Sequence, residues 1–119
     1  MSDPHEDAFN LFLPDGVLQW FDIVSSERTP GILRLVFEEK NIPPITEELR
    51  GKHVESKGFK EIFVDDFPVR GRKTTFVFRR RYWKVEGREE LLKRDIQLTW
   101  EGTQLEKEFA LFLKDRGRQ

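Results

Sequence analysis

Three consecutive stretches of residues 54–100 favour β-strands and are separated by short turns centred on glycine. Each stretch is rich in β-branched and aromatic residues, which fit a pleated and half-buried surface. Turns of this length join neighbouring antiparallel strands. The pattern therefore predicts a three-stranded meander. Its strands are Val54–Phe67, Thr74–Val85 and Leu92–Trp100, and its turns cover residues 70–73 and 86–88.

The N-terminal part of the chain predicts a short helix and a further hairpin. A proline at the first turn and apolar residues at helical spacing indicate a helix over residues 14–20. Residues 21–24 and 32–37 are predicted strands, joined by turn residues at 25–31. Pro43 and Pro44 exclude a helix interior and a central strand, so residues 41–49 are predicted to form a loop that crosses the domain.

The last predicted element is an amphipathic helix that begins near Thr103. Thr103 and Glu106 have the spacing of a capping box, in which each side chain satisfies a backbone N–H of the first turn. The apolar residues Leu105, Phe109, Phe112 and Leu113 recur at helical spacing and predict one buried stripe. We therefore expect an α+β fold, in which an antiparallel sheet of about five strands carries a short N-terminal helix and this C-terminal helix.

The length of 119 residues suits one domain. Residues 1–7 are acidic and polar and are expected to form a flexible leader, and residues 8–116 are expected to form the α+β domain. We find neither a signal-peptide pattern nor an apolar run long enough to span a bilayer. The expected location is therefore the cytoplasm.

The composition excludes several classes of site. The chain has no Cys, which excludes a disulfide scaffold, a zinc site with Cys ligands and a thiol nucleophile. It has 2 His, too few for a metal site built on histidine. We also find no phosphate-binding glycine loop and no catalytic serine or zinc-protease motif. We therefore predict a protein without catalytic activity, metal or cofactor.

The net charge of −1 results from two opposite halves. Residues 1–66 contain 7 Lys and Arg against 14 Asp and Glu, whereas residues 67–119 contain 14 against 8. The positive charge is densest over residues 70–84, which contain 7 basic residues and no acidic one. A net charge near zero therefore does not exclude a nucleic-acid partner.

The residue types of this basic stretch match the chemistry of DNA. Arginine forks fit phosphate oxygens and guanine edges, and neutralised phosphates release counterions. The turn at residues 70–73 is the predicted tip that enters a groove, and the strand that follows extends the patch. The candidate DNA-binding residues are Arg70, Arg72, Lys73, Arg79, Arg80, Arg81, Trp83 and Lys84.

Two other interpretations remain open at this stage. The arginines can form a solvated face that pairs with Glu86, Glu89, Glu90 or Asp95 beyond the next turn. Alternatively, the charge asymmetry can guide a protein partner, since such surfaces steer association without nucleic acid. The tryptophans are more often core residues than ligand platforms.

Three separated motifs resemble the N-terminal region of bacterial insertion-sequence transposases of the ISAon type. The first is Leu13-Pro14-Asp15-Gly16 with the apolar residues after it, and the second is the turn Asp66-Phe67-Pro68-Val69-Arg70-Gly71-Arg72 followed by the arginine-rich strand. The third is the helix that starts at Gly102-Thr103 and contains Lys107-Glu108-Phe109-Ala110. They occur in the same order and cover most of residues 11–115.

The resemblance implies a module that recognises the ends of an insertion sequence. In the wider set of transposases the same turn and strand belong to a zinc ribbon, which a helix-turn-helix and a DDE catalytic domain follow. This chain lacks the cysteines of the ribbon. The resemblance therefore implies a metal-free DNA-binding domain that is encoded apart from a DDE transposase catalytic subunit, its expected protein partner.

Overall fold

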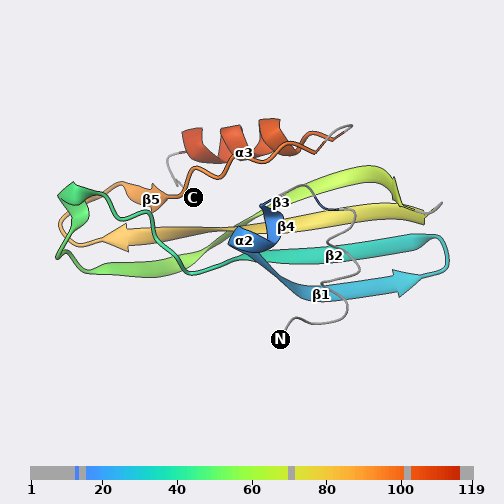
Figure 1. Ribbon diagram of the computed structural model, residues 1–119, viewed down its shortest axis with the longest axis horizontal. Coiled ribbons are helices and arrows are strands. Elements are labelled where there is room, and N and C mark those ends of the chain that lie inside the picture. The colour runs from blue at the N-terminus through green and yellow to red at the C-terminus, as the bar shows by residue number, and fades with distance from the viewer. Residues whose placement is uncertain (1–12, 14–15, 70–71, 101–102, 116–119) are drawn as a thin grey trace.

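A five-stranded sheet with a helix lying over one face dominates the structure (Figure 1). The computed structural model describes residue 13 and residues 16–69, 72–100 and 103–115, apart from the side chains of residues 66–69 and 72. The predicted leader lies outside these residues. In chain order the elements are α2 (Val17–Trp20), β1 (Phe21–Thr29), β2 (Ile32–Glu39), the 3-10 helix η1 (Glu47–Leu49), β3 (Val54–Val69), β4 (Arg72–Val85), β5 (Leu91–Lys93) and α3 (Leu105–Lys114).

The sheet is mixed, with β4 at its centre. β3 pairs with one edge of β4 over almost the whole length of that strand. The other edge is divided, since β2 pairs with residues 73–79 and β5 pairs with residues 82–84. β2 runs parallel to β4, and the other pairings are antiparallel. The prediction of an antiparallel sheet is therefore wrong. β3 occupies one edge of β4, so β2 pairs with the other edge, and there the two strands run parallel.

Each of the five predicted strands differs in length from the strand of the structure, and two of them, β1 and β5, differ by more than two residues. β1 continues through the polar residues after Val24 as far as Thr29, because β2 provides hydrogen-bonding partners for them. The turn is reduced to Pro30 and Gly31, and Gly31 has a φ of 84°, a conformation that favours glycine. The third predicted strand of the meander is shorter, since β5 ends at Lys93 and residues 94–100 form no ladder.

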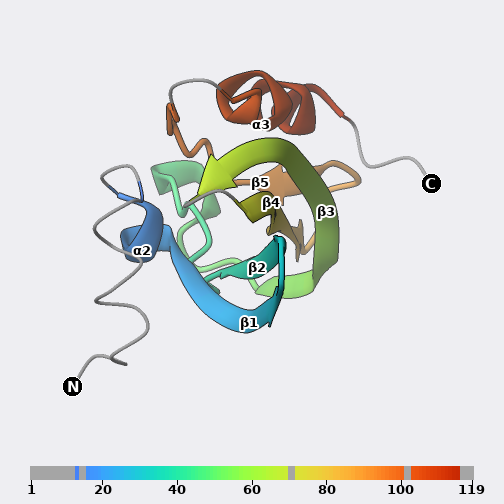
Figure 2. The ribbon, with the colours of Figure 1, turned by 90° about the vertical axis from the view of Figure 1, so that its right-hand side faces the viewer.

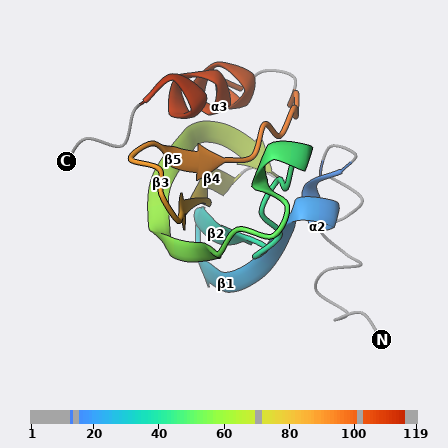
Figure 3. The ribbon, with the colours of Figure 1, turned by 90° about the vertical axis from the view of Figure 1, so that its left-hand side faces the viewer.

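The core lies between the sheet and the segments that cover it. Residues 94–100 still alternate between buried and exposed side chains, as a half-buried strand does. Figures 2 and 3 view the sheet from its two ends and show that β3 coils around β4 while α3 lies above them. The buried apolar cluster comprises Leu13, Val17, Phe21, Leu33, Leu35, Phe37, Ile62, Val64, Phe76, Phe78, Ile96, Leu98, Trp100, Leu105, Phe109 and Phe112.

The structure confirms the predicted apolar stripe of the C-terminal helix but not the predicted cap at the start of that helix. Leu105, Phe109 and Phe112 are buried, whereas Leu113 remains 36% exposed. The capping box does not form: Gln104 is the N-cap residue and makes no side-chain cap. The Thr103 hydroxyl instead donates to the carbonyl of Trp100 and accepts from the amide of Leu105, the first residue of the helix.

Within the described residues, the helices are all too short or too polar to cross a membrane.

Candidate nucleic-acid interface

The alternation of β4 separates its three consecutive arginines between the two faces of the sheet. Arg80 follows Phe76 and Phe78 on the face that packs against the core. Arg79 and Arg81 point to the opposite face, which we call the outer face. The three side chains therefore do not form one basic surface.

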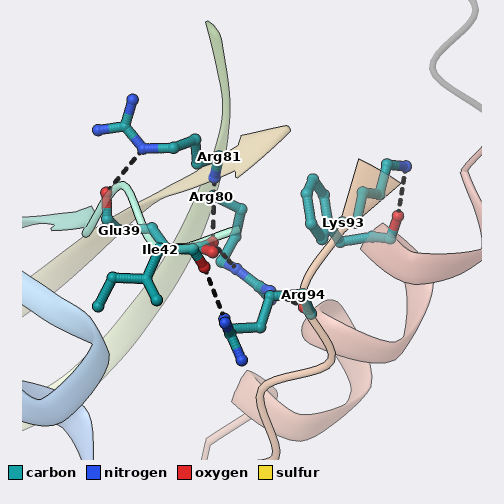
Figure 4. Close-up of polar contacts among 7 residues, drawn as sticks. Glu39, Ile42, Arg80, Arg81, Lys93 and Arg94 are labelled. Atoms are coloured by element: carbon teal, nitrogen blue, oxygen red, sulfur yellow. Dashed lines mark hydrogen bonds and ion pairs between the residues drawn. The ribbon is translucent and has the colours of Figure 1, made fainter. Parts of the chain in front are cut away.

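Arg80 is buried in an ion pair beneath α3 (Figure 4). Its Nε donates to Oε1 of Glu39 at 2.7 Å, and its Nη2 donates to the carbonyl of Arg94 at 2.6 Å. The guanidinium also lies 4.4 Å from the ring centre of Phe109 and 4.5 Å from that of Phe112. The pair occupies the place where β2 leaves the edge of β4 and β5 begins, and it joins the two parts of the sheet.

Burial shifts the pKa values of both partners of this pair. Removal from water raises the pKa of the Glu39 carboxyl above its ordinary value, and the attraction of Arg80 opposes this shift. Burial lowers the pKa of the Arg80 guanidinium, and Glu39 opposes that shift. Within the described residues, Oε2 of Glu39 and Nη1 of Arg80 have no hydrogen-bond partner. The pair is therefore held at a high desolvation penalty.

Arg79 and Arg81 are engaged in ion pairs and hydrogen bonds on the outer face. Arg79 lies between two carboxylates, with Nε 3.2 Å from Glu61 and Nη1 3.4 Å from Glu38. Arg81 donates to the hydroxyl of Ser56 at 2.6 Å and to the carbonyl of Glu39 at 3.1 Å. These partners come from β2 and β3 and not from the predicted carboxylates beyond residue 85. The interpretation as structural charge thus holds for this part of β4.

The other predicted contacts are dispersed. Trp83 is buried and its Nε1 donates to the side chain of Asn41 at 2.8 Å, so neither Trp83 nor Arg80 is available to DNA in this structure. Lys84 lies 11 residues along β4 from Lys73, roughly 36 Å for an extended strand. Arg70 and the side chain of Arg72 lie outside the described residues. Of the predicted set, the structure places only Lys73 as an exposed side chain at the predicted tip.

Three basic residues nevertheless lie at that end of the sheet, where the β1–β2 turn lies beside the start of β4 (Figure 1). The exposed Glu27 is the cross-strand partner of one of them, Arg34. The amide of Lys73 donates to the carbonyl of Gly31 at 2.8 Å and joins the two segments. Arg28 and Arg34 lie on the strands that flank this turn, and both are exposed. We call Arg28, Arg34 and Lys73 the basic end.

The basic end carries cations on both faces of the sheet. Arg34 and Lys73 share the outer face, since each lies at an even spacing from an outer-face residue of its strand. Arg28 pairs across the hairpin with the buried Leu33 and so belongs to the opposite face. Neither Arg28 nor Arg34 forms an ion pair with another described residue. A sheet end of this kind can place one cation on each wall of a groove.

Sequence reasoning missed Arg28 and Arg34 because they lie in the acidic half of the chain. They lie close to the turn Pro30-Gly31, one on each side of it, and this placement was the available signal. This signal could be interpreted only once the structure showed that β2 pairs in parallel with β4, because that pairing brings the turn beside the basic stretch.

No family model, curated protein or solved structure matches the chain.

Proposed function

We propose that this chain is a non-catalytic DNA-binding domain of a bacterial insertion-sequence transposase system, and that it recognises the ends of the element. The basic end is the proposed contact surface, together with Arg70 and Arg72 from the adjoining turn. The DDE chemistry would come from a separate catalytic subunit. The assignment to transposition rests on the three sequence motifs, and the assignment to DNA rests on the chemistry of the basic end.

The observation that carries the DNA proposal is the placement of Arg28 and Arg34 on opposite faces of one sheet end. A DNA groove is bounded by two phosphate backbones, and the major groove is wide enough, at about 12 Å, to admit a two-stranded ribbon. A ribbon with cations on only one face would contact one of the two backbones. The basic end can contact both, and Lys73 adds a further positive charge on the outer face.

Salt dependence of duplex binding tests this proposal. We expect fluorescence anisotropy with a 25-base-pair duplex, roughly two helical turns, to give an affinity that falls steeply with salt. Each phosphate contact contributes about −0.9 to the slope of log K against log salt. The Arg28→Ala/Arg34→Ala variant should therefore lower the magnitude of that slope by about 1.8.

The control is the Arg50→Ala/Lys52→Ala variant, which removes the same charge beside η1 at the opposite end of the sheet (Figure 1). It should leave the slope unchanged. An affinity that is independent of salt, or an equal loss in the two double variants, contradicts the proposed surface. Competition between terminal-repeat and mixed-sequence duplexes then tests recognition of the element ends.

A protein-interaction module that docks a catalytic transposase subunit without binding DNA is the second candidate. The observation in its favour is that Arg79, Arg80 and Arg81 are paired with carboxylates of the same chain, which leaves a smaller basic surface than the sequence indicates. Co-purification with the catalytic subunit, together with no shift of duplex DNA by this chain, would select this candidate.

A further inference from the structure

A groove runs along one side of α3. Its floor lies between the helix and the extended residues that follow β5. One part is lined by Asp95–Thr99 and by Glu106, Phe109, Ala110 and Leu113, and the adjoining part by residues 90–93 and 113–115. Leu113 borders both parts.

The extended wall of this groove has open backbone groups. Residues 95–99 alternate between buried and exposed side chains, but their backbone forms no hydrogen bond with any other described backbone group. Extended peptides add to such segments, because main-chain hydrogen bonds provide affinity and the alternating side chains provide specificity. The backbone therefore favours an extended occupant over a helix.

The side chains of the groove define the chemistry of that occupant. Ala110 and Leu113 expose apolar surface on α3, and Leu113 is 36% exposed. Asp95 and Glu106 are exposed carboxylates, and neither forms an ion pair with another described residue. Asp95 accepts a hydrogen bond from Gln97 and Glu106 accepts one from Thr99, which holds both carboxylates beside the groove. Among the described residues that line this first part, none is basic.

We propose that this groove binds an extended segment of a partner protein in which basic and aliphatic side chains alternate. The aliphatic side chains contact Ala110 and Leu113, and the basic side chains contact Asp95 and Glu106. The charge of the groove is opposite to that of the basic end, so the two surfaces select different partners. The proposal goes beyond DNA binding and does not depend on it.

A six-residue peptide that alternates lysine and leucine is the probe, and amide shifts of the isotope-labelled full-length chain are the readout. We expect the shifts to concentrate at residues 95–99 and on the facing side of α3. A peptide that alternates glutamate and leucine should cause none. The Asp95→Asn/Glu106→Gln variant should weaken binding about fivefold, as expected for the loss of two exposed charge contacts.

Two further variants separate this site from general attraction between charges. The Glu47→Gln/Glu89→Gln variant removes two exposed carboxylates outside the groove. Its affinity for the lysine–leucine peptide should stay within about twofold of that of the unmodified chain. Ala110→Arg places a cation in the groove and should abolish binding with an unchanged thermal melt. Shifts outside the groove, equal losses in the two double variants, or no shift at millimolar lysine–leucine peptide would each overturn the proposal. Binding to duplex DNA is measured separately and has no bearing on this outcome.

Discussion

The middle and the start of β4 both carry basic side chains, but the surroundings of these side chains differ. In the middle of the strand, Arg79, Arg80 and Arg81 each have a carboxylate partner on a neighbouring strand. At the start of the strand, Lys73 joins Arg28 and Arg34 on an exposed sheet end. The central arginines are therefore paired within the sheet, whereas Arg28 and Arg34 form no ion pair with another described residue.

Arg80→Ala is expected to have the largest effect on this contrast. It leaves the Glu39 carboxylate buried without its partner, which costs about 3–5 kcal/mol in the free energy of unfolding. Urea denaturation measures the loss. The Arg80→Met/Glu39→Met variant removes both charges and keeps the apolar volume, so it should recover most of the stability. A double variant as unstable as Arg80→Ala would show that the pair itself, and not the orphaned charge, is required.

Glu39→Gln is expected to change how stability depends on pH. Burial raises the pKa of Glu39 in the folded state above its ordinary value of 4.5. The resulting stabilisation is complete below pH 4.5 and is lost as the pH rises through the folded pKa, at no more than about 1.4 kcal/mol per pH unit. The unmodified protein should therefore lose stability relative to the Glu39→Gln variant as the pH rises.

Urea midpoints measured from about pH 4 to pH 7.5 test this direction, over the range in which buried carboxyl groups titrate. Glu47 is exposed, so the Glu47→Gln variant shows how the loss of an ordinary carboxylate changes the dependence of stability on pH. A profile for Glu39→Gln that is parallel to that of the unmodified protein would exclude a contribution of Glu39.

Arg79→Ala is expected to have the smallest effect. Its side chain is 38% exposed between Glu38 and Glu61, and ion pairs of this kind contribute about 0.2–1 kcal/mol. Duplex affinity should remain the same, because Arg79 lies away from the basic end. Thermal denaturation and anisotropy give the two values. A fall in affinity as large as that of the Arg28→Ala/Arg34→Ala variant would place the middle of β4 in the DNA surface after all.

The alternation of side chains along a strand is a local property, and it is sufficient to place Arg80 on the face of β4 that carries Phe78. The sequence did not show which face α3 covers or which strand lies beside β4. Those depend on the parallel pairing of β2 with β4, and local periodicity contains no signal for an interaction between such distant residues.

The same pairing explains why the candidate site was only partly predicted. Glu38 and Glu39 lie beside the arginines because β2 is in register with β4, whereas the sequence directed attention to the nearer carboxylates after residue 85. The apolar stripe of α3 was predicted because a helical repeat is local. Its capping box did not form, since the Thr103 hydroxyl bonds to the carbonyl of Trp100 and the amide of Leu105, and Gln104 is the N-cap residue.

The divided edge of β4 also has a consequence for the order of folding. The hairpins β1–β2 and β3–β4 close over short turns, whereas the first β2–β4 pair joins Ile32 to Lys73, 41 residues apart. Closing the longer loop carries the larger entropy penalty, so the two hairpins are expected to form first and to dock afterwards. Arg28 and Arg34 come from one hairpin and Lys73 from the other. The proposed DNA surface is thus assembled only when the two hairpins dock, and a chain in which they are still separate does not possess it.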